Sequence, residues 1–109
     1  GVFLYYNNLF STANLNPANE IVDILLESTN IRIEKIVSCG QASPPGFMYD
    51  QDENEWVIVI KGSAIVSFED GKKHKLNPGN YLNITAHQKH RVDWTLPDQE
   101  TLWLAVFYK

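Results

Sequence analysis

The stretch Tyr49–Gly62, which reads YDQDENEWVIVIKG, joins a polar, acidic loop directly to an apolar strand. Successive side chains of a strand point to opposite faces, so Glu55 shares one face with Val57 and Val59. The opposite face is also apolar and carries Trp56, Ile58 and Ile60. A strand with two apolar faces is covered on both sides. Because a buried carboxylate is costly unless it is paired or coordinated, Glu55 is the first candidate for a functional residue.

The rest of the chain alternates short apolar runs with turn signals. Asp70-Gly71 predicts a type I′ hairpin, and Pro78-Gly79 predicts another turn. Many short strands separated by regular turns are typical of a sandwich or barrel, so we expect an all-β fold. Besides 56–60, the β-branched and aromatic runs predict strands at 31–38, 63–68, 72–76, 81–85, 90–95 and 101–108.

One short N-terminal helix is expected before these strands. Asn16-Pro17 places a capping side chain ahead of a proline at the first helical position, and Glu20 follows near the positive end of the helix. The apolar residues that recur next at helical spacing are Ile21, Ile24 and Leu25. The pattern predicts that the helix ends at Thr29-Asn30.

Composition limits the class of protein. The 109 residues are enough for one domain, and a hydrophobic content of 44% with 20% charged residues is typical of a globular chain. The net charge of −4 argues against nucleic acid and anionic membrane surfaces as partners. No run approaches the roughly 20 apolar residues of a membrane span. The single cysteine, Cys39, excludes an internal disulfide and favours a reducing, cytoplasmic location.

The motifs around Glu55 and further along the chain resemble those of the cupins, small β-barrels of the jelly-roll type. Their first motif has two histidines one residue apart, then three or four residues, a glutamate, six residues and a glycine. Glu55 and Gly62 reproduce its second half, and Pro78-Gly79 followed by His90 has the spacing of the second motif. Thr85 stands where the family usually has proline, and His87 where it often has glycine. The resemblance covers 41–108 of a single domain, 1–109, in which 1–38 would hold the helix and the first strands.

The resemblance implies a metal site inside the barrel. In cupins the glutamate and three histidines hold a divalent ion, and Glu55 and His90 occupy two of these positions. The two first-motif histidines are absent. Three intervening residues would place Tyr49 and Gln51 there, which is the register we prefer, and four would place Met48 and Asp50 there. The candidate metal ligands are therefore Gln51, Glu55, His90, Tyr49 and Asp50, and the ion could be zinc, iron, manganese or nickel.

Each candidate residue could also have a purely structural role. His90 is either a ligand or a hydrogen-bonded core histidine, and without a metal we expect it to hydrogen-bond Glu55 and to have a raised pKa. His87 fits a rim position bonded to backbone, and His74 an exposed strand. Asp50 also fits a solvated loop.

Two functions follow from the resemblance. The first is a barrel that binds a small polar molecule, with or without a metal. The alternative is a metal-dependent isomerase, lyase or dioxygenase acting on a sugar or small organic acid, with Glu55, Tyr49 or His87 moving a proton. Whether the chain is an enzyme stays open.

A homodimer is expected as well. The outward residues Trp56, Ile58 and Ile60 need a cover, and the N-terminal segment 1–10, GVFLYYNNLF, is too apolar for a free tail.

Overall fold

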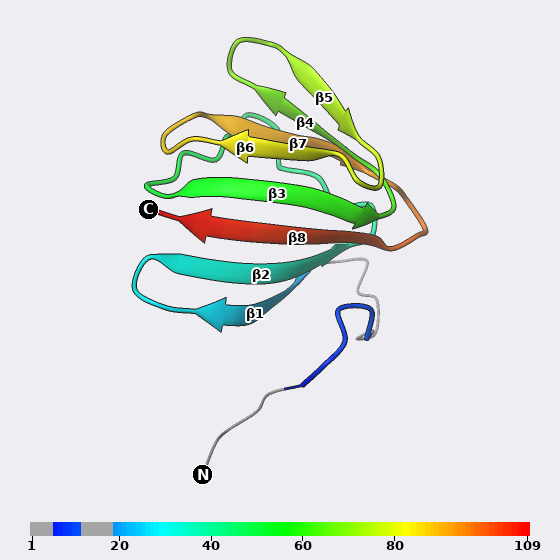
Figure 1. Ribbon diagram of the computed structural model, residues 1–109. Coiled ribbons are helices and arrows are strands. Elements are labelled where there is room, and N and C mark those ends of the chain that lie inside the picture. The colour runs from blue at the N-terminus through cyan, green and yellow to red at the C-terminus, as the bar shows by residue number, and fades with distance from the viewer. Residues whose placement is uncertain (1–5, 12–18) are drawn as a thin grey trace.

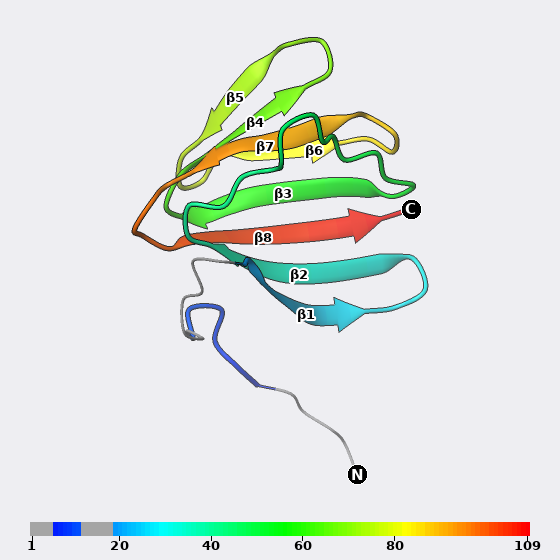
Figure 2. The same cartoon turned by 180° about the vertical axis from the view of Figure 1, so that it is seen from behind.

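The computed structural model describes residues 6–11 and 19–109, which form eight strands in two antiparallel sheets (Figures 1 and 2). Strands β1, β2, β8, β3 and β6 lie side by side in that order in the first sheet, and β5, β4 and β7 form the second. The predicted all-β, jelly-roll architecture is confirmed. The strands are β1 (Ile21–Glu27), β2 (Ile31–Ser38), β3 (Asn54–Lys61), β4 (Ala64–Phe68), β5 (Lys73–Leu76), β6 (Tyr81–Ile84), β7 (His90–Thr95) and β8 (Thr101–Tyr108).

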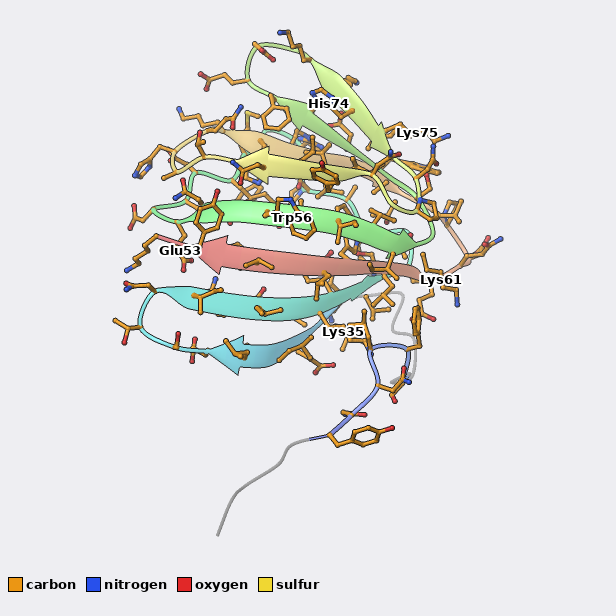
Figure 3. The ribbon with its side chains drawn as sticks, in the orientation of Figure 1. Lys35, Glu53, Trp56, Lys61, His74 and Lys75 are labelled. Atoms are coloured by element: carbon orange, nitrogen blue, oxygen red, sulfur yellow. The ribbon has the colours of Figure 1, made fainter. Side chains whose placement is uncertain are left out.

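Strand β3 lies between β8 and β6, so both of its edges are hydrogen-bonded. Its inward residues are those that strand alternation predicts, since Glu55, Val57 and Val59 are all buried. The core between the sheets consists of Val57, Val59, Ala64, Val66, Leu76, Ile84, Trp103, Ala105 and Phe107. Trp56 lies on the outer face (Figure 3), where its ring centroid is 5.4 Å from that of Tyr81 and its side chain is half-buried.

The predicted helix is wrong over the described part of its range. Ile21–Glu27 is strand β1, which pairs antiparallel with β2 from Ile21 opposite Val37 to Glu27 opposite Arg32. The apolar spacing fits a helix, but the free edge of β2 offers backbone hydrogen bonds, and β-branched residues favour a strand. The expected helix start at Asn16-Pro17 lies outside the described residues.

Two glycines adopt the left-handed backbone region in turns next to β4. Gly71 has a φ of +87°, and the β4–β5 hairpin forms as predicted. Its turn is not type I′, because that turn needs positive φ at both central residues and Asp70 is not among the positive-φ residues. Gly62 has a φ of +86°, and a Cβ placed there would lie 2.5 Å from Thr101 Oγ1, so this turn admits only glycine.

Within the described ranges, no helix has the length and apolar character needed to cross a membrane.

Candidate functional site

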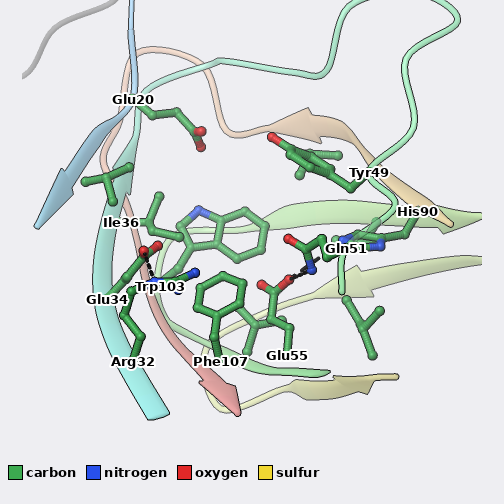
Figure 4. Close-up of a pocket in the computed structure, with 15 residues that line it drawn as sticks. Glu20, Arg32, Glu34, Ile36, Tyr49, Gln51, Glu55, His90, Trp103 and Phe107 are labelled. Carbon is green, nitrogen blue, oxygen red and sulfur yellow. Dashed lines mark hydrogen bonds and ion pairs between the residues drawn. The ribbon is translucent and has the colours of Figure 1, made fainter. Parts of the chain in front are cut away.

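A cavity of about 290 Å³ lies between the two sheets (Figure 4). It reaches solvent near the start of β1, where Glu20 and Val22 are exposed. Its walls combine aliphatic, aromatic and charged side chains from both sheets and from the loop before β3. The lining residues are Glu20, Val22, Arg32, Glu34, Ile36, Tyr49, Gln51, Glu55, Val57, Val66, Ile84, His90, Val92, Trp103 and Phe107.

The buried polar part of the cavity is a contact among Glu55, His90 and Gln51. Glu55 comes from the start of β3 and His90 from the start of β7, and they are 9% and 5% exposed. His90 Nε2 lies 3.7 Å from Glu55 Oε1, and Gln51 Nε2 donates a hydrogen bond of 3.2 Å to the same oxygen. The structure therefore brings together three of the residues that the motifs single out.

The loop before β3 is held at this point by backbone hydrogen bonds. Figure 2 shows the segment between β2 and β3 running back across the molecule toward β7. Tyr49 N donates to His90 O at 2.6 Å, and His90 N donates to Tyr49 O at 3.2 Å. This isolated bridge makes Tyr49 and Gln51 line the cavity, whereas Met48 and Asp50 do not. The geometry thus matches the register with three intervening residues.

The protonation state of His90 is linked to Glu55. The Nδ1–H group of His90 donates to the carbonyl of Gln88 at 2.9 Å, which leaves Nε2 facing the carboxylate. Burial lowers the pKa of His90, but the Glu55 carboxylate and the Gln88 carbonyl together raise that pKa above its usual value. A raised pKa for His90 is expected from the sequence, and the direction of the shift agrees. The expected direct hydrogen bond is not formed, because 3.7 Å is too long for one.

Tyr49 forms the wall next to His90. Its ring stacks on the imidazole with centroids 5.4 Å apart and an interplanar angle of 25°. Burial raises the pKa of the Tyr49 phenol, and the negative charges of Glu20 and Glu55 raise it further. The phenol is therefore a neutral hydrogen-bonding group near neutral pH.

The charged side of the cavity was not predicted as part of the site. Arg32 Nε donates to Glu34 at 2.8 Å, and its two terminal nitrogens donate to the two oxygens of Glu53 at 3.0 Å each. The guanidinium also lies 4.4 Å from the centroid of the Phe107 ring. Strand alternation in β2 could have predicted that Arg32 and Glu34 line the cavity, because they share a face with the lining residue Ile36.

Glu20 lines the cavity and is connected to the core by a chain of hydrogen bonds. Trp103 Nε1 donates to Ser38 Oγ at 3.0 Å, and Ser38 Oγ donates to Glu20 Oε2 at 2.8 Å. The sequence pattern had placed Glu20 in the first turn of a helix. In the structure it lies just before β1, with its carboxylate at the cavity.

His87 and Asp50 do not join the cavity. His87 Nδ1 lies 2.7 Å from Asp50 Oδ1, His87 Nε2 lies 3.3 Å from Asp52 Oδ1, and all three side chains are exposed. The geometry therefore does not support His87 as a catalytic residue or Asp50 as a metal ligand at the Glu55 site. His74, on β5, is exposed as expected.

The comparisons with known proteins agree with this architecture. A sequence profile of the cupin domain matches residues 37–107, which is more than half of the chain. The chain belongs to the cupin family. This cupin is 42% identical to a candidate mannose-6-phosphate isomerase from Ralstonia eutropha JMP134, with a TM-score of 0.92 over 96% of this chain and 98% of that one.

Two further crystal structures share the fold at low sequence identity. An RmlC-like cupin from Desulfovibrio desulfuricans is 16% identical, with a TM-score of 0.77 over 97% of each chain. A cupin superfamily protein from Desulfitobacterium hafniense DCB-2 is 15% identical, with a TM-score of 0.72 over 88% of this chain and 83% of that one. No curated protein sequence matches this cupin significantly.

The ligand set of this cupin differs from that of a tight metal centre. Residues 6–11 and 19–109 contain no group of three or more His, Cys, Asp or Glu side chains placed to hold a metal ion. Glu55 and His90 supply two strong ligands, whereas zinc sites use at least three and the common iron oxygenase site uses two histidines and a carboxylate. A tight zinc or iron centre therefore does not fit these residues.

Proposed function

We propose that this cupin binds a small polar molecule in the barrel interior and anchors it on Glu55 and His90. The observation that carries the proposal is the buried contact of these two side chains at the wall of a cavity of about 290 Å³. This volume is at the small end of ligand pockets, which span roughly 300–1,000 Å³. The ligand is therefore about as large as a monosaccharide.

The chemistry of the pair suits a ligand that both donates and accepts hydrogen bonds. Glu55 accepts, and His90 Nε2 donates when the ring is protonated, a state that the raised pKa favours. One ligand hydroxyl could donate to the carboxylate and accept from the imidazolium. Gln51 orients the carboxylate through its hydrogen bond to Oε1, while Trp103 and Phe107 offer apolar surface to the carbon skeleton.

The second candidate function is an isomerase. It is favoured by the 42% identity to the candidate mannose-6-phosphate isomerase and by a carboxylate and a histidine that face each other across 3.7 Å. Isomerisation between an aldose and a ketose moves a proton between neighbouring carbons, and Glu55 would be the base.

The test is an NMR titration of isotope-labelled protein with a panel of monosaccharides and small hydroxy acids. We expect at least one compound to shift the indole N–H signal of Trp103 and the ring signals of His90. Glu55→Gln should weaken that compound's binding about tenfold, because a hydrogen bond to a charged group contributes roughly 1.5–3 kcal/mol. His74→Gln is the matched control and should leave the affinity unchanged.

Two outcomes separate the candidates. Binding that is lost with Glu55→Gln, without conversion of mannose 6-phosphate to a ketose, supports the binding function. Conversion that is lost with Glu55→Gln supports the isomerase. If every shift maps to the outer face around Trp56 and none to Trp103 or His90, the cavity is not the site.

A further inference from the structure

The charges around the cavity are unbalanced. The carboxylates of Glu20, Glu34 and Glu55 all line it, as Figure 4 shows around the rings of Trp103 and Phe107. Against these three groups stand one arginine, Arg32, and one histidine, His90. Within the described part of the chain, the lining includes no lysine.

The guanidinium of Arg32 is already hydrogen-bonded to two carboxylates of this chain. Its Nε and both terminal nitrogens donate to Glu34 and Glu53, so the planar fork that recognises phosphate or carboxylate is filled by carboxylates from this chain. The face of the guanidinium lies against Phe107. The described residues also lack a helix whose N-terminus could receive a phosphate group. Among the described lining residues, His90 is the cation left to meet an anionic ligand, and it already faces the Glu55 carboxylate.

Glu55 points to a ligand independently of the other carboxylates. Its side chain is 11% exposed, and its hydrogen bond from Gln51 and its contact with His90 both involve Oε1. Among the described residues, no hydrogen bond to Oε2 is formed, and this oxygen is not one of their fully buried unpaired polar atoms, so a molecule in the cavity can reach it. A donor from the ligand could bind this oxygen, because both oxygens of a carboxylate accept hydrogen bonds.

We infer that the ligand is an organic ammonium of monosaccharide size, and that a phosphorylated sugar is disfavoured. The inference rests on the proposed function, because it names the chemical class that the same cavity takes. The ammonium group meets Glu55 or Glu20, while the rings of Tyr49, Trp103 and Phe107 line the same space and attract a cation through their faces. Burial is the main cause of the raised pKa of Tyr49, and the negative charges of Glu20 and Glu55 raise it further.

The experiment uses three nitroxides of one shape that differ in charge: 4-amino-TEMPO, 4-hydroxy-TEMPO and 4-carboxy-TEMPO. The readout is the paramagnetic relaxation enhancement of the Trp103 indole N–H, assigned by its disappearance in Trp103→Phe. We expect the enhancement to be about fivefold larger with the cation than with the anion, and intermediate with the neutral probe. Glu20→Gln should reduce this ratio. The matched control is Glu69→Gln, which changes net charge equally at an exposed residue outside the cavity lining and should preserve the ratio.

Two results would overturn the inference in different ways. If the neutral probe reaches Trp103 and the anion is as effective as the cation, the cavity has no preference for cations, and the proposed binding function survives alone. If no probe affects Trp103 while all three affect exposed amides, the cavity is closed to molecules of this size. The proposed function then fails, and the inference fails with it.

Discussion

His90 Nε2 faces Glu55 Oε1 across 3.7 Å inside the barrel, and both side chains are buried. The carbonyl of Gln88 accepts the hydrogen bond from Nδ1–H, so a neutral His90 would present its Nε2 lone pair to a carboxylate. That arrangement is repulsive, whereas one proton on Nε2 makes it attractive. The separation is also too long for a direct hydrogen bond, so a polar ligand atom could contact both groups.

The first prediction is that Glu55→Gln lowers the pKa of His90. Burial alone lowers this pKa, and the carboxylate is a main reason why it lies above the usual value. Without the negative charge, the ring should lose its proton at a lower pH than in the wild type. NMR titration of the His90 ring signals measures this directly. An unchanged His90 pKa would mean that Glu55 is not the partner.

The same shift has a consequence for stability. Because the folded-state pKa of His90 is raised, protonation of His90 stabilises the fold. This contribution is fully present below the unfolded pKa of about 6.5 and is lost as the pH rises through the folded pKa. The Tm advantage of the wild type over Glu55→Gln should therefore be larger at acidic than at alkaline pH. A Tm difference that stays constant with pH would contradict the linkage.

The second prediction concerns the turn between β3 and β4. Gly62→Ala places a Cβ 2.5 Å from Thr101 Oγ1 and 2.7 Å from the carbonyl oxygen of Glu100, at a φ of +86°. Left-handed backbone costs about 1–2 kcal/mol and overpacking about 1–3 kcal/mol, so the loss of unfolding free energy should be roughly 2–5 kcal/mol. Urea denaturation measures it. Gly71→Ala is the control: its φ is similar, nothing lies within 4 Å, and only the backbone cost of about 1–2 kcal/mol applies.

The third prediction concerns the hydrogen-bond chain from Trp103 to Glu20. Ser38→Ala removes the acceptor of the buried Trp103 indole N–H. A buried donor without a partner costs about 1–3 kcal/mol, so the variant should be destabilised by that amount in urea. Ser28→Ala, at an exposed turn residue, is the control and should change stability by less than about 0.5 kcal/mol. Equal effects of the two changes would show that the buried chain contributes nothing.

The fourth prediction concerns metal content. Glu55 and His90 are two strong ligands, which is fewer than a tight zinc or iron site uses. Protein purified without added metal should therefore contain well below one equivalent of zinc, iron, manganese or nickel by elemental analysis. A full equivalent that is lost in Glu55→Ala and kept in His74→Ala would contradict this and restore the metal centre expected from the family resemblance.

The fifth prediction is a homodimer, which we propose on the basis of β1. This strand is the end of its sheet, and in the described part of the chain its outer edge pairs with no other strand. It also exposes large apolar side chains at 41–57% of their area: Val22, Ile24, Leu25 and Leu26. Such an edge is a template for pairing, and a second copy of the same edge is self-complementary.

Light scattering after size-exclusion chromatography should give twice the chain mass. Leu26→Lys should shift the protein toward the monomer, whereas Tyr81→Lys, at an exposed apolar residue on the opposite end of the sheet, should not. A monomer mass across the accessible concentration range would contradict the proposal.

The strands and the anchor of the site could be read from the sequence because they depend on local alternation. Glu55, Val57 and Val59 point inward because side chains alternate along a strand, and the flanking turn residues set where each strand ends. The resemblance to the cupin motifs, and not alternation, singled out Gln51 and His90 as partners of Glu55, and the structure brings the three side chains together. Only the inward direction of Glu55 requires no knowledge of which strands become neighbours.

Only the tertiary structure decided what depends on neighbours. Residues 21–27 are a strand because the free edge of β2 supplies backbone partners that local spacing does not reveal. Arg32 and Glu34 belong to the cavity because β2 pairs with β8 and so turns one of its faces toward Phe107. His87 has a left-handed backbone, and its side chain contacts Asp50 and does not line the cavity. The charged residues that line the cavity come from segments far apart in the chain. Their combined charge can therefore be known only from the folded barrel.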